Sequence, residues 1–331
     1  MSDKKIILQA TGLNRVFTRK PGLLHKLQTM HAVNNVSLKL HQGETIGIVG
    51  ESGCGKSTLA RMLAGLDQPS TGQVQLLGKN TEQHDLLKNR SLASKIQYVF
   101  QDPIASLNPR KTVEQILNAP LVHLCNMNKQ ARQKKISELL NLVGLHEDFL
   151  QRYPHEFSGG QAQRIGIARA LAVQPRVLVL DEPVSALDVS IQAQILKLLQ
   201  DLKQELGLSY VFISHDLSVI ESISDRVYVM YFGNVVEQAN SKYIFQQPKH
   251  PYTRLLLRSA PDINKQDNPA TRGTDGQELP DPYHPPKGCS FYKRCANALE
   301  KCSQLIPALE NDTESDHQWA CFNPERNRNS N

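Results

Sequence analysis

The strongest constraint on the fold is a glycine-rich segment that lies between an apolar strand and an amphipathic helix. Residues 46–49 read Ile-Gly-Ile-Val, and residues 50–57 read Gly-Glu-Ser-Gly-Cys-Gly-Lys-Ser. Apolar residues then recur at helical spacing, at Leu59, Met62 and Leu63. The pattern Gly-x4-Gly-Lys-Ser between a strand and a helix is typical of a phosphate-binding loop, the Walker A motif. Its glycines let successive N–H groups point inward, and the helix N-terminus adds positive potential.

The side chains of this loop have the chemistry needed to bind ATP. Lys56 can reach the β and γ phosphates, and the Ser57 hydroxyl can ligate Mg²⁺. We therefore predict that the chain binds ATP with Mg²⁺ and hydrolyses it. The residues predicted to contact ATP are Phe17, Gly50, Glu51, Ser52, Gly53, Cys54, Gly55, Lys56, Ser57 and Thr58.

A second motif supplies carboxylates for the metal ion and the attacking water. Residues 177–180 read Val-Leu-Val-Leu and are followed by Asp181 and Glu182, which is a Walker B pattern. The apolar strand fixes both carboxylates at its C-terminal edge, where α/β sheets bind ligands. We expect Asp181 to hold Mg²⁺ through water and Glu182 to act as general base. Acidic pairs at strand ends are often only turn residues, so the functional interpretation of this pair depends on the presence of the Walker A loop.

Strand-like and helical segments alternate along most of the chain. The first 48 residues alternate apolar and polar side chains, as in short strands. Residues from about 105 to 165 show helical spacing and are predicted to form a helical insert, after which strands and helices alternate again. This alternation predicts an α/β fold with a mostly parallel sheet. Residues 261–287 are rich in Pro, Asp, Gly and Asn and indicate a linker or irregular structure.

Charge and hydropathy limit where such a chain can work. The formal net charge of the 331 residues is only +6, which favours a solvated surface over a strongly anionic partner. Nucleic acid is therefore not an expected partner. The chain has no run of 18 apolar residues, and its N-terminus does not resemble a signal peptide. We expect it to stay in the cytoplasm and to act at a membrane only through a partner.

A third motif makes a family resemblance specific. Residues 157–161 read Phe-Ser-Gly-Gly-Gln and precede a predicted helix, so two glycines and a serine hydroxyl form a second anion-binding site. The segment resembles the signature motif of ATP-binding-cassette (ABC) ATPases, with Phe157 in place of the more usual Leu. Residues 1–245 are thereby expected to form an ABC nucleotide-binding domain. The resemblance implies a RecA-like P-loop core with an antiparallel β subdomain and the helical insert, and it leaves residues 246–331 as a C-terminal extension.

The same resemblance implies that the ATP site is shared between two subunits. In ABC ATPases two subunits pack head to tail, and each signature covers the ATP held by the other Walker A loop. The signature residues that should serve the opposite site are Ser158, Gly159, Gly160 and Gln161. The residues that resemble the D-loop, which crosses this interface, are Ser185, Ala186, Leu187 and Asp188.

Two further polar residues match the family by their order and spacing. Gln101 resembles the Q-loop glutamine, which contacts Mg²⁺ and water and relays closure to a transport partner. His215 resembles the switch histidine, which hydrogen-bonds the γ-phosphate and orients the water. The resemblance thus implies a catalytic set of Glu182, His215, Gln101 and Lys56, and Mg²⁺ contacts from Ser57, Gln101 and Asp181.

Phe17 is the candidate for the aromatic ring that stacks on adenine. Stacking of this kind is worth roughly 1–3 kcal/mol and tolerates different bases. The alternative is that Phe17 is a core aromatic residue. A basic insert over residues 19–31 separates it from the next strand, and that insert has no assigned role.

Segments outside these motifs resemble the dipeptide and oligopeptide importer branch. They are Ser-Leu-Asn-Pro-Arg at residues 106–110, His-Pro-Tyr-Thr at residues 250–253, and a cysteine-containing tail. The chain is most similar to the F-type ATPase of the dipeptide permease pair, which implies a heterodimer with a related D-type ATPase. It also implies two integral-membrane permeases, a periplasmic solute-binding protein, and peripheral attachment to the cytoplasmic face of the inner membrane. Dipeptides, longer peptides, haem and nickel are solutes of this branch.

Four of the six cysteines lie close together near the C-terminus, at Cys289, Cys295, Cys302 and Cys321. Disulfides are disfavoured in the cytoplasm, so a bound metal is the first alternative to free thiols. Four cysteines suit Zn²⁺ or an iron–sulfur cluster. The family resemblance favours a 4Fe–4S cluster with a structural role, because ATP hydrolysis needs no redox step.

Two other functions remain open from the sequence. One is an ABC ATPase that works without a permease, in Fe–S assembly, translation or DNA repair. The peptide-importer segments disfavour it, and co-purification with membrane permeases would separate the two. The other is a nucleotide-sensing regulator that binds ATP without turning it over.

Overall fold

The computed structural model describes residues 5–20, 28–80, 93–259, 279–312 and 316–325. Parts of the basic insert and of the linker expected from the sequence therefore lie outside the described residues. The strands are β1 (Ile6–Arg19), β2 (Gln28–His41), β3 (Thr45–Val49), β4 (Thr71–Leu76), β5 (Lys79–Asn80), β6 (Ile96–Val99), β7 (Val177–Asp181), β8 (Ser209–Ser214), β9 (Arg226–Tyr231), β10 (Asn234–Asn240), β11 (Glu310–Asn311) and β12 (Gln318–Trp319). The α-helices are α1 (Lys56–Leu63), α3 (Val113–His123), α4 (Lys129–Leu142), α5 (Gly159–Leu171), α6 (Val189–Leu206), α7 (Leu217–Ile223), α8 (Ser241–Gln246) and α9 (Pro251–Ser259).

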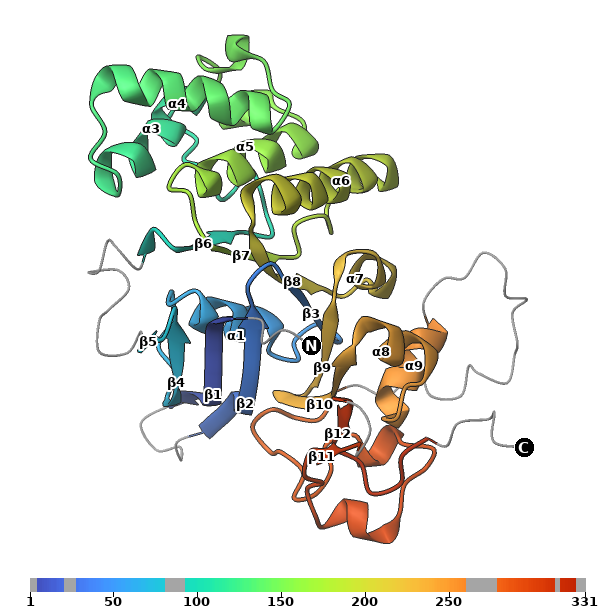
Figure 1. Cartoon of the computed structure of the whole chain (residues 1–331). Helices are drawn as coiled ribbons and strands as arrows, with labels where there is room; N and C mark the ends of the chain where they lie inside the picture. The colour runs from blue at the N-terminus through green and yellow to red at the C-terminus, as the bar shows by residue number, and fades with distance from the viewer. Residues whose placement is uncertain (1–4, 21–27, 81–92, 260–278, 313–315, 326–331) are drawn as a thin grey trace.

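A mostly parallel sheet forms the centre of the molecule (Figure 1). Its strand order is β11-β12-β10-β9-β3-β8-β7-β6, and the pairs from β9 to β6 are parallel. The burial of strand β7 shows why this sheet lies at the centre of the molecule. Leu178 and Leu180 point into one hydrophobic core and Val177 and Val179 into the other, so both faces of the strand are buried. A strand of this kind is a continuous apolar run, as the sequence of β7 is.

An antiparallel sheet with strand order β2-β1-β4-β5 covers one side of α1 (Figure 1). Strands β1 and β2 are each 14 residues long, whereas the alternating pattern of this region predicted short strands. The difference arises at register shifts between Ala10 and Leu13 and between Leu13 and Arg15, where irregular pairing interrupts the alternation without ending the strand.

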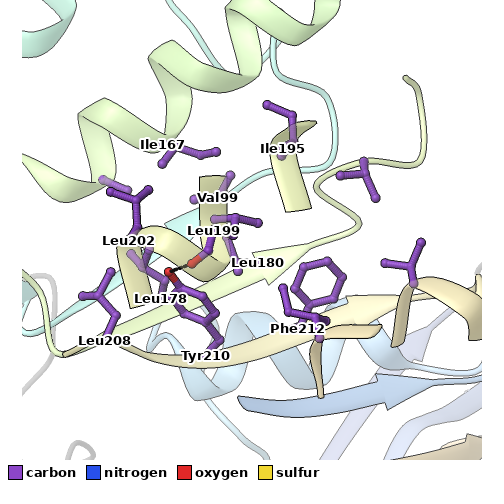
Figure 2. Packing of buried hydrophobic residues seen from close by; sticks show 14 of the residues in the cluster. Val99, Ile167, Leu178, Leu180, Ile195, Leu199, Leu202, Leu208, Tyr210 and Phe212 are labelled. Carbon is purple, nitrogen blue, oxygen red and sulfur yellow. Dashed lines mark hydrogen bonds between the residues drawn. The ribbon is translucent and has the colours of Figure 1, made fainter. Parts of the chain in front are cut away.

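Helices α3 to α6 lie together beyond the β6–β7 edge of the parallel sheet (Figure 1). Figure 2 shows how α5 and α6 pack on that sheet, with Ile167 and Leu199 over Leu178 and Leu180. The buried Tyr210 hydroxyl donates a hydrogen bond of 2.8 Å to the carbonyl oxygen of Leu199, so the sheet and α6 are also joined by a polar contact. Helices α3 and α4 lie within the residues predicted to form the helical insert, about 105 to 165.

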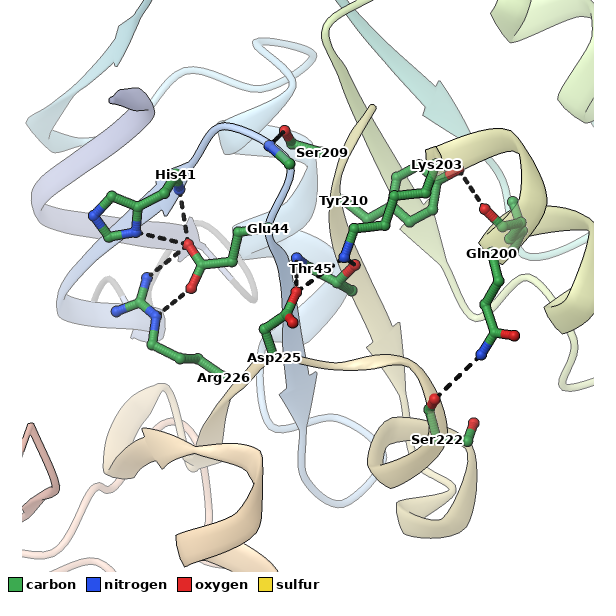
Figure 3. Close-up of polar contacts among 12 residues, drawn as sticks. His41, Glu44, Thr45, Gln200, Lys203, Ser209, Tyr210, Ser222, Asp225 and Arg226 are labelled. Carbon is green, nitrogen blue, oxygen red and sulfur yellow. Dashed lines mark hydrogen bonds and ion pairs between the residues drawn. The ribbon is translucent and has the colours of Figure 1, made fainter. Parts of the chain in front are cut away.

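A polar network fixes the start of β3, the strand that leads into the glycine-rich loop (Figure 3). The Glu44 carboxylate accepts a 2.8 Å hydrogen bond from the backbone N–H of His41 and pairs with Arg226 of β9. Burial raises the pKa of Glu44, but Arg226 and His41 lower it more, so the net shift is downward. Asp225 accepts from the Thr45 N–H at 2.7 Å and from Lys203 of α6 at 2.9 Å. The network therefore joins β3 to two other elements.

The described residues from 279 onward pack against the β10 end of the parallel sheet and extend it (Figure 1). Strand β12 pairs with β10, and the fully buried Glu237 of β10 accepts hydrogen bonds from the N–H groups of Lys249 and His250. His317 Nε2 lies 2.7 Å from the same carboxylate. Short 3-10 turns, η4 (Tyr292–Arg294) and η5 (Glu300–Ser303), complete this segment. Of the described helices, none is long and apolar enough to cross a membrane.

Candidate nucleotide-binding site

The glycine-rich loop connects the fully buried strand β3 to the first turn of α1, as its sequence predicts. Lys56 is only 5% exposed, and its Nζ donates to the carbonyl oxygens of Gly50 at 2.8 Å and Glu51 at 2.9 Å. Gly55 has φ 105°, and a Cβ there would lie 2.1 Å from the carbonyl oxygen of Ala32. Only glycine fits this position, because both the dihedral angle and the space exclude a side chain. The loop thus wraps around the lysine ammonium.

A cavity of about 510 Å³ lies at this loop and brings together residues from distant parts of the chain. Carboxyl ends of adjacent parallel strands meet at one edge of a sheet. Here the segments that follow β3, β6, β7 and β8 all reach that edge. The residues that line the cavity are Phe17, Met30, His31, Ala32, Ser52, Gly53, Gly55, Lys56, Ser57, Thr58, Gln101, Glu182, His215, Phe232, Gly233 and Pro282.

Asp181, the last residue of β7, is held on both carboxylate oxygens. The Ser57 hydroxyl donates to Oδ1 at 3.0 Å, and the Tyr98 hydroxyl donates to Oδ2 at 2.6 Å. Burial raises the pKa of Asp181 above its usual range, although both hydrogen bonds act in the opposite direction. Burial likewise raises the pKa of Tyr98, so this phenol remains a hydrogen-bond donor at neutral pH. A hydroxyl and a carboxylate side by side are the hard oxygen ligands that suit Mg²⁺.

Two other polar side chains of the cavity wall contact the Glu182 carboxylate. Gln101 Nε2 donates to Glu182 Oε2 at 3.0 Å, and His215 Nδ1 lies 3.1 Å from the same oxygen. The backbone of Glu182 has φ 45°, a left-handed conformation that costs energy for a residue with a side chain. Its N–H donates to the Ile213 carbonyl at 3.0 Å, which helps to hold the strained residue in place. The carboxylate is therefore held in the wall of the cavity that Lys56 and Ser57 also line.

Phe17 also lines the cavity, at some distance along the chain from its other members. The ring is 38% exposed, and the Arg15 guanidinium lies 4.8 Å from its centroid. It pairs with Met30 across the β1–β2 ladder. An exposed ring at the rim of the cavity has a face available for stacking, unlike a core aromatic side chain.

Some residues predicted to contact ATP do not line the cavity with their side chains. Gly50, Glu51 and Cys54 are absent from its wall. The Cys54 thiol is 1% exposed, and burial raises its pKa, so it faces the interior of the fold. For these three positions, contact with ATP stays a prediction.

The signature residues Ser158–Gln161 are not part of the cavity wall either. Ser158 caps α5, and its hydroxyl accepts from the Gln161 N–H at 3.4 Å. The glycines that follow pack on the D-loop and α6, since a Cβ on Gly160 would lie 2.6 Å from Ile191 Cγ2. Phe157 is buried and contacts the Phe149 ring edge-on, so it fills an apolar site as a leucine would. The glycines of the signature thus lie against the D-loop and α6, outside the wall of the chain's own Walker A cavity.

Sequence reasoning missed two groups of residues at the site. Residues 30–32 of β2 and residues 232–233 after β9 form part of the cavity wall, but their sequences carry no motif. Tyr98 could have been suspected, because a buried tyrosine in an apolar strand needs a partner for its hydroxyl. The partner, Asp181, follows from the pairing of β6 with β7, which the sequence does not specify.

The four C-terminal cysteines converge on one small cavity, whose wall includes Cys289, Cys295, Cys302 and Cys321. All four are free thiols. Burial raises the pKa of Cys295 to about 11 and that of Cys321 to about 12. Within the described part of the chain, however, no three His, Cys, Asp or Glu side chains are grouped closely enough to hold a metal ion. The donors have the right chemistry, but their present spacing is not that of a formed metal site.

Comparison with known proteins gives matches over almost the whole chain. The family described as "ABC transporter" matches residues 33–185, and the one described as "Oligopeptide/dipeptide transporter, C-terminal region" matches residues 236–302. The chain is 48% identical to the dipeptide transport ATP-binding protein DppF of Haemophilus influenzae, with 96% of each chain covered. It is 46% identical to DppF of Escherichia coli, covering 98% of this chain and 96% of that protein. It is also 46% identical to the oligopeptide transport ATP-binding protein AppF of Bacillus subtilis, covering 97% and 98%.

Among solved structures, the fold resembles the ATP-binding cassette MJ0796. A dimeric post-hydrolysis state of MJ0796 bound to ADP and Pi matches with a TM-score of 0.63 and 31% identity. The match covers 71% of this chain and 99% of that one. The cassette therefore accounts for most of the present chain and leaves a remainder that MJ0796 lacks.

Proposed function

This chain belongs to the ABC transporter family, among its dipeptide and oligopeptide transport ATP-binding proteins, and we propose how its site works within such a transporter. It is an ATP-binding and ATP-hydrolysing subunit that powers the import of peptides through a membrane ABC transporter. The observation that carries this function is the Glu182 carboxylate, held by Gln101 beside His215 in the cavity that also contains Lys56 and Ser57.

The proposed roles of the loop residues follow from their present contacts. Lys56 exchanges its bonds to two loop carbonyls for the β and γ phosphates of ATP, and the backbone N–H groups of the loop donate to the same phosphates. Ser57 and Asp181 would hold the Mg²⁺ that accompanies ATP, and Gln101 would be a further contact. Mg²⁺ would neutralise the charge that develops on the phosphates. Phe17 stacks on the adenine ring at the rim of the cavity.

We assign the attack on the γ-phosphate to Glu182, His215 and Gln101. Glu182 accepts a proton from the attacking water, and Gln101 orients both the carboxylate and the water. His215, whose side chain is 55% exposed, can turn between Glu182 and the γ-phosphate. The carboxylate needs no large movement, because the strained backbone already holds it at the cavity wall.

We further propose that the site is completed by a second ATPase subunit, a related D-type chain. Three observations support this. Ser158–Gln161 lie outside the cavity of their own chain, the D-loop residues Ala186 and Asp188 are exposed, and the apolar Val189 beside them is 82% exposed. A partner subunit at the D-loop would cover Val189. In this arrangement the signature of each subunit closes the ATP site of the other.

Replacing Ser158 by Arg tests this arrangement in heterodimers in which one Walker A loop is inactive. If the Walker A loop of this chain is inactive, only the opposite site turns over, and S158R is expected to reduce its ATPase activity about 100-fold, because the variant loses a hydroxyl donor at the phosphate and adds bulk. If the opposite loop is inactive instead, the activity that remains should change less than threefold. Equal losses in both heterodimers would contradict a signature that acts on the opposite site.

Two permeases and a periplasmic binding protein complete the proposed transporter, with this chain bound peripherally at the cytoplasmic face of the inner membrane. Residues 1–245 form the proposed ATPase domain, with its helical part at about 105–165, and residues 246–331 the peptide-importer extension. The family match of the C-terminal region supports the assignment of the chain to a peptide transporter and the assignment of its last part to a peptide-importer extension.

Mild extraction of membranes tests the assembly. The tagged chain is expected to co-purify with two integral-membrane permeases and with one related ATPase in equal amount. ATPase activity of the assembly should increase when a peptide-loaded binding protein is added. Recovery of the chain free of permeases from membranes and from the cytosol alike would favour the ABC ATPase that works without them.

We propose that the four C-terminal cysteines hold a 4Fe–4S cluster, which their convergence on one cavity supports. The thiols would have to move closer together when the cluster binds. They would also have to lose their protons, since the pKa values of Cys295 and Cys321 are raised. Zn²⁺ is the weaker alternative, because a single Zn²⁺ ion needs its four thiolates closer together than a cluster does.

Protein purified without oxygen should contain about four iron and four sulfide per chain, whereas a variant with Cys295 and Cys321 both replaced by Ser should contain neither. Stoichiometric zinc without sulfide would replace the cluster by a zinc site. Protein that lacks both metals would remove the metal proposal.

A further inference from the structure

The C-terminal segment contacts the phosphate-binding loop directly, through Arg294 of η4 and Glu51 of the loop. Arg294 Nη1 donates to Glu51 Oε2 and Nη2 donates to Oε1, both at 2.8 Å. The two side chains are 11% and 28% exposed. Two parallel N–H···O bonds between a guanidinium and a carboxylate fix both the distance and the orientation of the two groups. Glu51 is therefore held in one geometry by a residue outside the ATPase motifs.

A second residue after position 245 holds the backbone of Glu51. The Glu51 N–H donates to the Tyr252 hydroxyl at 2.9 Å, and Tyr252 is fully buried. The Arg294 guanidinium in turn lies 5.8 Å from the Tyr231 ring and 5.7 Å from the Phe291 ring. These aromatic side chains limit where the guanidinium can go. The loop segment that starts with Glu51 is thus clamped at its amide and at its carboxylate from the same side.

The contact between Arg294 and Glu51 also compensates a charge. A loop that binds a triphosphate gains from positive potential, but Glu51 places a carboxylate inside the loop sequence, one residue from Ser52 in the cavity wall. The carbonyl oxygen of Glu51 also accepts from Lys56 Nζ, which connects this residue to the phosphate-binding lysine. Arg294 supplies the positive charge that compensates the carboxylate.

We propose that Arg294 is a positioning residue for ATP, which neutralises Glu51 and holds the phosphate-binding loop in its binding conformation. It acts through Glu51 and does not touch the nucleotide. This role rests on the proposed function and adds to it: that function assigns no role in ATP binding to a residue after position 245, although Pro282 lines the cavity. The C-terminal extension thereby sets the affinity of the cassette for ATP as well as any contacts it makes with other subunits.

Nucleotide affinity of the Arg294→Ala variant tests the proposal, with ATP itself as the probe and free Mg²⁺ held constant. The dissociation constant for ATP is expected to rise about tenfold, since the change leaves a partly buried carboxylate without its partner. The KM for ATP should rise with it, while kcat should fall less than threefold. Lys293→Ala is the matched control, because Lys293 is the exposed neighbour of Arg294 in the same turn and should leave both values unchanged.

Removal of the charge on Glu51 separates positioning from a general loss of structure. In Glu51→Gln with Arg294→Ala, the dissociation constant should return to within about threefold of the wild-type value, because no carboxylate is left uncompensated. Arg294→Lys keeps the charge without the two parallel bonds and should weaken binding less than Arg294→Ala does.

Two results would overturn the proposal. One is an unchanged dissociation constant in Arg294→Ala. The other is a double variant that binds ATP as weakly as Arg294→Ala alone while the thermal midpoints of both equal that of the wild type. In either case the wild type would still bind ATP, so the ATPase function would stand. If Arg294→Ala does not fold, two other variants replace it. Arg294→Lys is then compared with the wild type, and the double variant Glu51→Gln with Arg294→Gln provides a neutral amide pair. The same two outcomes for the dissociation constant overturn the proposal.

Discussion

The Glu182→Gln variant is expected to bind ATP normally and to hydrolyse it about 10²–10⁴ times more slowly than the wild type, the range typical for loss of a general base. Glutamine has nearly the shape of glutamate and can keep a contact with Gln101 and His215, but it cannot take up a proton. The loss should therefore fall on kcat, and the dissociation constant for ATP should stay within about threefold of the wild-type value. Steady-state phosphate release and equilibrium nucleotide binding measure the two quantities.

The matched control is Glu205→Gln on α6, where the same chemical change is made at an exposed position. It should leave turnover unchanged. Hydrolysis by Glu182→Gln at more than a tenth of the wild-type rate would mean that another group accepts the proton. A wild-type chain that binds ATP but never hydrolyses it, even with its partners present, would instead make this a nucleotide-sensing regulator.

The Lys56→Ala variant should lose both ATP affinity and turnover. Lys56 Nζ is the cation that the loop surrounds, and its hydrogen bonds to Gly50 and Glu51 also shape the loop. Loss of one such electrostatic contact typically lowers turnover about 10²–10³-fold. Because the lysine binds the phosphates of bound ATP as well as those of the transition state, we expect the dissociation constant to rise in parallel, unlike in Glu182→Gln.

Lys79→Ala provides the control for loss of a positive charge, since Lys79 lies exposed on β5. Its ATPase activity should equal that of the wild type. Unchanged turnover by Lys56→Ala would place the ATP site elsewhere in the chain. A circular dichroism spectrum and a thermal midpoint equal to those of the wild type would show that the loss does not come from unfolding.

The predicted fold class, a RecA-like α/β core with an antiparallel β subdomain and a helical insert, is confirmed by the structure and its similarity to an ATP-binding cassette. Local patterns carried this prediction. The apolar run of β7, the loop before α1 and the helical spacing of residues 113–142 each specify one element without reference to the rest. Such motifs are readable because a strand end or a helix start already fixes the direction of the groups that matter.

The contacts between elements were much less predictable. The hydrogen bond from Tyr98 to Asp181 depends on which strands are neighbours, and the left-handed conformation of Glu182 depends on how the chain turns after β7. The pairing of β12 with β10 rests on two residue pairs, too few to leave a pattern in the sequence. From the sequence alone, Arg294 was one basic residue of a cysteine-containing tail and had no predicted role. Its partner, Glu51, was assigned to ATP, although its side chain turns away from the cavity and toward Arg294.

The pairing of Glu51 with Arg294 also has a consequence for how the protein is made. The two residues are 243 positions apart, and at about 5–20 residues per second the ribosome adds Arg294 roughly 12–50 s after Glu51. Throughout this interval the growing chain has the whole phosphate-loop sequence but not the cation that compensates its carboxylate. On our proposal, a newly synthesised subunit therefore acquires high affinity for ATP only after Arg294 has been added. A product cut short before Arg294 would compete poorly for nucleotide, even with every ATPase motif intact.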